Sequence, residues 1–192
     1  MLAVAFNSFK IVALAVLLCS CMQNNKPQDN YIPKDNEPAV KPLIAKAGQP
    51  NVTINTGNTT PAQLLAYAKT LKGIPYKYGS LKPEDGFDCS GFITYVFNHF
   101  GIAVPRSSVD FTYVNHEIPL KDARPGDLIL FTGTDSIKRI VGHMGILIST
   151  GQEPVFIHST SGKAYGVTET PLNTYYQGRY MKTLRVFKQD GE

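Results

Sequence analysis

The spacing of apolar residues changes within this chain, and that change restricts the fold more than any other feature. In residues 64–71 and 92–100, apolar side chains recur at helical spacing. After Pro125-Gly126 they stand instead in short runs bounded by Gly, Pro and Thr, which is typical of strands. These runs are DLILF at 127–131, MGILIS at 144–149, VFIH at 155–158 and a last stretch at 180–187. Two helices followed by strands predict an α+β domain, with N-terminal helices packed on a central antiparallel β-sheet.

The N-terminus carries the pattern of an export signal. Ile11–Leu18 is an unbroken apolar run preceded by Lys10, which is too short to span a bilayer. The sequence Leu18-Cys19-Ser20-Cys21 that follows resembles the lipobox of bacterial lipoproteins. We therefore expect residues 1–20 to be a lipoprotein signal peptide and Cys21 to be lipidated. The alternative is an ordinary secretory signal in which Cys21 carries no lipid.

Lipidation at Cys21 would anchor an exported chain to a membrane of the cell envelope. Met22 stands where an Asp retains lipoproteins in the inner membrane of well-studied Gram-negative bacteria. Its presence favours the periplasmic face of the outer membrane.

Residues 21–60 differ in composition from the rest of the chain. Residues 22–60 contain seven Asn and five Pro and show little apolar periodicity. We interpret residues 21–60 as the lipidated Cys and a flexible tether with a reach of roughly 35 Å. The alternative is a short ordered arm packed on the domain. The folded domain is then expected at 61–192, where Thr60-Pro61 has the pattern of a helix start.

Composition excludes several classes of protein. With 192 residues, 43% of them hydrophobic, the chain can form one domain with a substantial core. The net charge of +4 comes without a Lys/Arg cluster, so we expect no nucleic-acid partner. If Cys19 is removed with the signal peptide and Cys21 carries lipid, Cys89 has no disulfide partner. A lone thiol in an oxidising compartment is expected to be either buried or used.

Cys89 and two histidines form the candidate catalytic set. Cys89 begins the second helix, where unpaired N–H groups are expected to lower the pKa of a thiol and to hold an oxyanion. His143 and His158 lie at the edges of predicted strands, where one imidazole could take the thiol proton and the other could orient it. Gly142 and Gly145 leave room for close approach. The alternative is a buried structural cysteine with ordinary histidines, as we expect for His99 and His116.

Four motifs occur in order along the domain. They are GIPYKYG at 73–79, DCSGF at 88–92, RPGDL at 124–128 and GHMGI at 142–146. Together they resemble the NlpC/p-sixty family of bacterial cell-wall cysteine peptidases, over residues 61–187. Two positions and one segment depart from the family pattern: Ser80 replaces a second glycine, Phe111 stands at a usual Gln place, and the segment 132–141 is long and basic. We interpret residues 132–141 as a solvated turn.

The resemblance implies a papain-like fold and a set of roles. Cys89 would be the nucleophile, His143 the general base and His158 the residue that orients it. The hydroxyl of Tyr76 would face the cysteine. Asp88 and Ser90 match positions that help hold the free amine of an L-Ala end.

The reaction that the resemblance implies is hydrolysis of the γ-D-glutamyl–diaminopimelate amide in peptidoglycan stem peptides. We expect no cofactor and no metal, because the His and Asp residues do not stand at zinc spacing. The expected partners are stem peptides and, through Cys21, a membrane, and the protein is expected to be a monomer. The alternatives are an amidase or acyl transferase with the same Cys–His site, and a catalytically quiet wall-binding lipoprotein.

Overall fold

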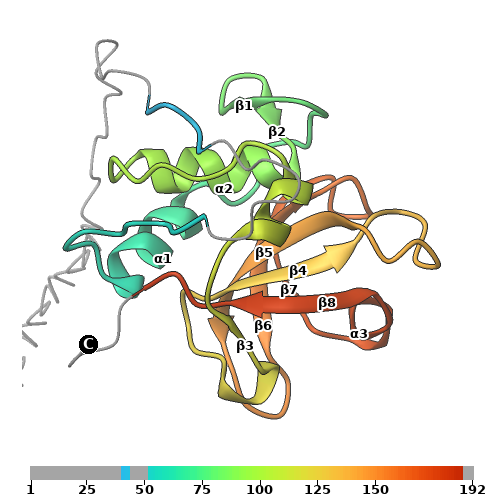
Figure 1. Ribbon diagram of the computed structural model, residues 1–192. Helices are drawn as coiled ribbons and strands as arrows, with labels where there is room; N and C mark the ends of the chain where they lie inside the picture. The colour runs from blue at the N-terminus through green and yellow to red at the C-terminus, as the bar shows by residue number, and fades with distance from the viewer. Residues whose placement is uncertain (1–39, 44–51, 188–192) are drawn as a thin grey trace, which may run out of the picture. The chain divides into compact units, whose positions relative to one another are not determined.

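A computed structural model describes residues 40–43 and 52–187, all of which fall in one compact unit, Pro38–Glu192 (Figure 1). The expected signal peptide and Cys21 lie outside the described residues. Within the described ranges, no helix is long and apolar enough to cross a membrane.

Two helices precede the sheet, as the sequence predicts. Helix α1 spans Pro61–Thr70 and α2 spans Cys89–Asn98. Thr60 and Gln63 form a reciprocal capping box at the start of α1: the Thr60 N–H donates to Oε1 of Gln63 at 2.9 Å, and the Gln63 N–H donates to the Thr60 hydroxyl at 3.3 Å. Helix α1 therefore begins where its sequence satisfies the exposed N–H groups.

The central sheet has six antiparallel strands in the order β3-β8-β4-β5-β6-β7. Their bounds are Glu117–Ile118, Tyr180–Leu184, Leu128–Thr132, Val141–Ser149, Val155–Thr160 and Gly166–Pro171, in that order. A separate hairpin, β1 (Leu81–Lys82) with β2 (Gly86–Phe87), precedes α2. The 3₁₀ helices η1 (Ser108–Tyr113) and η2 (Leu120–Asp122) and the short helix α3 (Thr174–Arg179) complete the elements. The predicted α+β class with an antiparallel sheet is confirmed.

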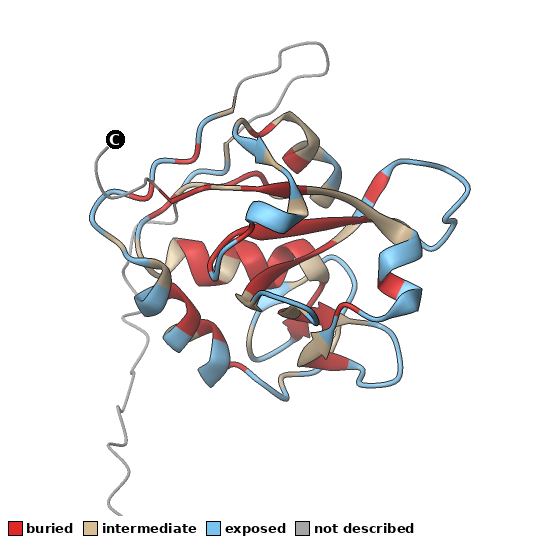
Figure 2. Cartoon of the chain, turned by 90° about the horizontal axis from the view of Figure 1, so that it is seen from below, coloured by how far each residue is buried: buried red, intermediate tan, exposed pale blue. Residues whose placement is uncertain are grey.

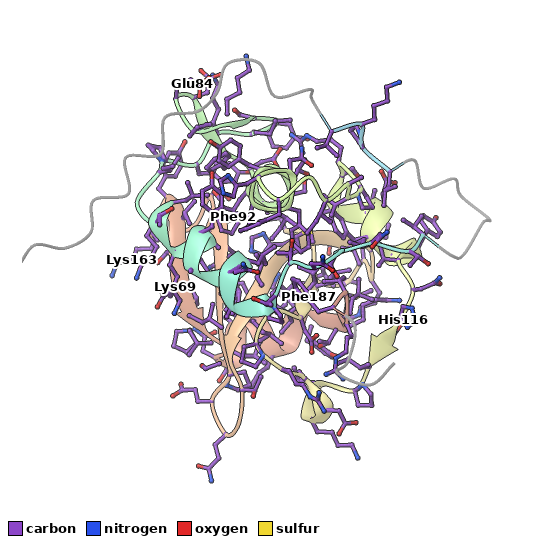
Figure 3. The ribbon with its side chains drawn as sticks, turned by 90° about the vertical axis from the view of Figure 1, so that its left-hand side faces the viewer. Lys69, Glu84, Phe92, His116, Lys163 and Phe187 are labelled. Atoms are coloured by element: carbon purple, nitrogen blue, oxygen red, sulfur yellow. The ribbon has the colours of Figure 1, made fainter. Side chains whose placement is uncertain are left out.

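The centre of the sheet is buried on both faces, most completely at β4 (Figure 2). Alternate residues of β4 divide between two cores: Leu128 and Leu130 join the cluster that contains α1 and α2, whereas Ile129 and Phe131 join a second cluster with Tyr176 of α3. Because both sets of side chains are buried, β4 reads as a continuous apolar run rather than an alternating one. Figure 3 looks along α2, with Phe92 beside it in the larger core.

Part of the expected tether is packed on the domain. The Val52 N–H donates to the Tyr113 carbonyl, and the Asn115 N–H donates to the Val52 carbonyl, both at 3.0 Å. Ile54 is 6% exposed. A flexible tether is therefore wrong for residues 52–60, and an ordered arm describes them, because a short apolar segment here completes the core.

Replacing Ile54 with alanine tests whether this arm stabilises the domain. We expect the free energy of unfolding to fall by about 2 kcal/mol or more, since a buried isoleucine is truncated to leave a cavity. The matched control is Asn58→Ala, an exposed position on the same segment, which should stay within about 0.5 kcal/mol of the wild type. Equal stabilities of the two variants in denaturant titrations would show that the arm adds nothing.

Candidate active site

The start of α2 is built by a tight loop that fixes Cys89. Asp88 caps the helix by accepting the Gly91 N–H at its side chain, while the Asp88 N–H donates to the Ser80 carbonyl at 3.0 Å. A Cβ on Gly91 would stand 2.0 Å from that carbonyl oxygen. The glycine of the DCSGF motif is therefore required for the loop to pass so close to the helix.

Asp88 and Ser90 are held by an arginine that the sequence interpretation missed. Arg106 donates to both Asp88 carboxylate oxygens, at 3.3 and 3.0 Å, and to the Ser90 hydroxyl at 3.0 Å. Asp88 is 8% exposed and Ser90 5% exposed, and neither lines the cavity described below. The expected role in holding an L-Ala amine therefore has no geometric support in this structure. Here Asp88 caps α2, and both residues bind Arg106.

The two candidate histidines lie side by side on neighbouring strands. Nε2 of His143 on β5 is 2.7 Å from Nδ1 of His158 on β6, and their rings meet edge to face. Gly145 allows this approach, because a Cβ there would stand 3.2 Å from the His158 Cβ and 2.7 Å from the Phe156 ring. His158 is fully buried. The expected pairing of the two imidazoles is thus present.

A third polar residue continues this chain. Nε2 of His158 is 2.9 Å from the hydroxyl oxygen of Thr170 on β7. The sequence interpretation missed Thr170, because its strand, GVTETP, has no run of apolar residues. The only available signal was its place on the strand that pairs with β6, where His158 is opposite Thr168.

Cys89 and His143 both line one cavity of about 890 Å³. Tyr76, Tyr78 and Thr170 also line it, so the expected position of Tyr76 at the site agrees with the structure. The Cys89 thiol donates to the Gly142 carbonyl, with Sγ 3.8 Å from the oxygen. Since Nε2 of His143 faces His158, Nδ1 is the ring nitrogen left for the thiol.

The electrostatics of the cysteine differ from the expectation. Burial, together with the negative charge of Asp88, raises the pKa of Cys89 to about 11, although backbone N–H groups of α2 and Arg106 act in the opposite direction. The expected lowering of the Cys89 pKa is therefore wrong, because desolvation and the capping carboxylate outweigh the effect of the helix start.

Burial, with a contribution from the positive charge of Arg179, lowers the pKa of His143 to about 3. Burial also lowers the pKa of His158. At neutral pH the resting pair is a thiol beside a neutral imidazole.

The raised pKa of Cys89 predicts how an alkylating agent will react. The thiolate fraction below pH 11 rises about tenfold per pH unit, so we expect slow labelling by iodoacetamide at pH 7 and a steady increase towards pH 10. Asp88→Asn removes the negative charge while keeping a capping oxygen, and it should speed labelling at every pH. A labelling rate that is already constant between pH 5 and 8 would instead indicate a preformed thiolate–imidazolium pair.

His99, His116 and Phe111 lie away from this chemistry, whereas Thr134, from the segment expected to be a solvated turn, lines the cavity. His99 stacks on Tyr67, with ring centroids 3.6 Å apart, and His116 is exposed. Phe111 is buried in the core. Residues 133–140 connect β4 to β5, with Ile137 90% exposed. Among residues 40–43 and 52–187, no cluster of three or more His, Cys, Asp or Glu could hold a metal ion.

Comparisons with known proteins agree on one family. Residues 73–185 match the model of the NlpC/P60 family. The gamma-DL-glutamyl hydrolase of Bacillus subtilis is 32% identical over 145 residues, which are 76% of this chain and 33% of that protein. The chain thus spans about a third of that relative. The murein DD-endopeptidase MepS/murein LD-carboxypeptidase of Escherichia coli K12 is 28% identical over 181 residues, covering 93% of this chain and 90% of that protein.

Solved structures show the same fold. An NlpC/P60 family protein from Bacillus cereus is 29% identical with a TM-score of 0.60, over 69% of this chain and 42% of that one. A Staphylococcus aureus protein described as similar to lipoprotein, NLP/P60 family, is 28% identical with a TM-score of 0.59, over 71% of this chain and 44% of that one. With its ordered motifs, its sheet and its Cys–His cavity, the chain belongs to the NlpC/P60 family.

Proposed function

We propose that this protein is a peptidoglycan endopeptidase that uses Cys89 as its nucleophile and cleaves the γ-D-glutamyl–diaminopimelate amide of stem peptides. The observation that carries the proposal is the placement of Cys89 and His143 in one cavity, with His143 hydrogen-bonded to His158. The named activities of the relatives support the substrate class. The B. subtilis gamma-DL-glutamyl hydrolase supports the bond, at 32% identity.

The reaction begins with transfer of the Cys89 proton to Nδ1 of His143 as sulfur attacks the glutamyl carbonyl carbon. The oxyanion that forms is stabilised by backbone N–H groups at the start of α2 and by the Tyr76 hydroxyl. When the C–N bond breaks, the imidazolium of His143 gives its proton to the leaving amine. A water molecule then transfers a proton to His143 and attacks the thioester, and this releases the carboxylate product and the thiol.

The histidine chain fixes which nitrogen of His143 can act as a base. Nδ1 must be unprotonated to take the thiol proton, so neutral His143 carries its proton on Nε2 and donates it to Nδ1 of His158. His158 then carries its own proton on Nε2, where the Thr170 hydroxyl oxygen accepts it. Thr170 is therefore a positioning residue, whose hydroxyl oxygen accepts the His158 proton in the tautomer that the reaction requires.

Replacing Thr170 with valine removes the acceptor while keeping the shape of the side chain. We expect kcat to fall about tenfold with KM little changed, because the buried His158 N–H loses its acceptor and the tautomer that the reaction requires is destabilised. Thr170→Ser should restore most of the activity. A fall caused by lost packing would follow the methyl group rather than the hydroxyl, and in that case the serine variant, which lacks the methyl group, would be slow while the valine variant, which keeps it, would not.

Product analysis tests the proposed bond. Purified peptidoglycan is incubated with the protein, and the fragments are identified by mass spectrometry. New D-glutamyl carboxylates paired with new diaminopimelate amines are expected. Cleavage at a bond between two D-centres, as the name DD-endopeptidase of the E. coli relative suggests, would keep a cell-wall endopeptidase but overturn the proposed bond. Cleavage of a bond outside the stem peptides would indicate an amidase, and transfer to an acceptor without hydrolysis would indicate an acyl transferase. If no bond of the peptidoglycan is cleaved, a catalytically inactive wall-binding protein would be favoured.

We further propose that the chain is a lipoprotein anchored through Cys21 at the periplasmic face of the outer membrane. The residues preceding Cys21 have the lipobox pattern, and one structural neighbour is described as similar to lipoprotein. Metabolic labelling with a palmitate analogue should mark the wild type and leave Cys21→Ser unlabelled. Label on both proteins, or on neither, would contradict the anchor.

A further inference from the structure

We propose that Lys163 and Arg179 form a carboxylate-binding site in the cleft beside Cys89, so that anionic groups flanking the scissile amide select the substrate. This inference rests on the proposed function for the position of the amide. It concerns what binds in the cavity rather than which atoms react, and it assigns a task to two residues that the mechanism above does not use.

The charged side chains that line the cavity are all positive. Lys163 and Arg179 are the lining residues with a full charge at neutral pH, and the lining contains no Asp or Glu. The other polar side chains of the lining are the Cys89 thiol, the His143 imidazole and neutral hydroxyls such as those of Thr134, Ser161 and Tyr175. A cavity with walls of one sign raises the local concentration of ligands of the opposite sign.

Arg179 is held rigidly but is not neutralised. At the end of α3, its guanidinium donates to the carbonyls of Thr132 and Gly133, at 2.9 and 2.7 Å, and to the Tyr175 hydroxyl. It also lies over the Tyr175 ring, 4.9 Å from the centroid. These partners are neutral, so the guanidinium keeps its positive charge in a fixed position. Most of its N–H groups are used in holding it, so it is suited to attract a carboxylate mainly through its fixed positive charge.

Lys163 supplies the second charge from another element. It lies in the turn between β6 and β7, is exposed, and makes no ion pair with any residue in the described part of the chain. Figure 3 shows its side chain extending from the edge of the molecule, away from Phe92 in the core. A long flexible side chain in this position can reach a ligand that lies in the mouth of the cavity.

The acidic side chains nearest in sequence to the lining residues have other partners. Asp88 is bound by Arg106, Asp135 pairs with Lys138, and Glu169 pairs with Lys72. Each of these carboxylates therefore pairs with a cation that is not part of the cavity lining. An anionic substrate would therefore be the group that meets Lys163 and Arg179.

The position of Arg179 also connects binding to catalysis. Its positive charge acts against protonation of His143, which is the step that the thiol attack requires. A substrate carboxylate bound to Arg179 offsets that charge and so makes His143 a stronger base. The carboxylate is therefore expected to increase kcat as well as binding.

Binding to an inactive protein tests the inference independently of turnover. The full chain with Cys89→Ala is titrated with two synthetic stem peptides, one with its carboxylates free and one with the carboxylates flanking the scissile amide converted to carboxamides. We expect the carboxylate peptide to bind about tenfold more tightly at low salt, as for a charge-assisted hydrogen bond. The preference should shrink in 1 M NaCl. Lys163→Gln and Arg179→Gln are each added to Cys89→Ala. Each should reduce the ratio between the affinities for the carboxylate and the carboxamide peptides, and should leave the affinity for the carboxamide peptide unchanged.

Equal affinity for the two peptides at low salt would overturn the inference, and so would a preference that both variants retain in full. Lys163 lies on an exposed turn, so its substitution tests the site even if Arg179→Gln disturbs the β4–β5 loop. The product analysis separates the two proposals. A wild-type protein that cleaves stem peptides without distinguishing the two peptides contradicts only the carboxylate site. A protein that selects the carboxylate peptide but cleaves nothing contradicts only the proposed function.

Discussion

Replacing Cys89 with alanine is expected to lower kcat for stem-peptide cleavage by at least about 10³-fold. The reason is that no other group lining the cavity can form a thioester, so only substrate positioning and oxyanion stabilisation remain. The variant should retain the melting temperature of the wild type within about 2 °C, because Cys89 is only partly buried and makes one weak side-chain contact.

Cys89→Ser is the second variant in this test. The hydroxyl keeps the size of the thiol, but the neutral imidazole of His143 is a weak base for it, so the serine variant should be nearly as slow as the alanine variant. Activity in Cys89→Ala within tenfold of the wild type would mean that another residue is the nucleophile. Loss of activity together with a large fall in melting temperature would point to a structural role for the cysteine.

Replacing His143 with glutamine is expected to have the second-largest effect, again about 10³-fold on kcat. Glutamine keeps the approximate size of the imidazole and a polar end, but it cannot take the thiol proton or return it to the leaving amine. Both half-reactions lose their proton carrier, so the acyl-enzyme should neither form nor decay at a useful rate. KM should change little, since the imidazole acts on the transition state rather than on ground-state binding.

The chain offers matched controls for this substitution. His99→Gln and His116→Gln change the same residue type at positions outside the cavity, and both should keep wild-type kcat. The kcat of His158→Asn should lie between that of His143→Gln and that of the two controls, because an amide oxygen can still accept the Nε2–H of His143. An effect of His99→Gln as large as that of His143→Gln would indicate general damage to the fold and would remove the evidence for a specific base.

Local sequence chemistry explains how much of the fold could be predicted. Thr60 and Gln63 form a cap from side chains three residues apart, and the apolar run of β4 follows from burial on both faces of the sheet. Cys89 and His143 could be found because each stands in a recognisable motif. His158 could be found because it ends an apolar strand that was expected to pair with the strand of His143.

The missed features depend on contacts between distant parts of the chain. Arg106 reaches Asp88 across 18 positions, and Thr170 reaches His158 across 12, and neither residue has a distinctive sequence neighbourhood. The sign of the Cys89 pKa shift also depends on burial, which a helix start alone does not reveal. The ordered arm was only the alternative interpretation, because residues 52–60 carry few apolar side chains, and the tertiary environment of Ile54 outweighs their polar composition.

The most direct test of the central claim is detection of the thioester on Cys89. The wild-type protein is mixed with a stem-peptide substrate, quenched in acid within milliseconds, and analysed by mass spectrometry of the intact chain and of its proteolytic peptides. The mechanism predicts a transient mass increase equal to the glutamyl fragment, located on Cys89, removed by hydroxylamine and absent from Cys89→Ala. Turnover of the same substrate through an adduct on another residue, or full activity in Cys89→Ala without any adduct, would contradict the account.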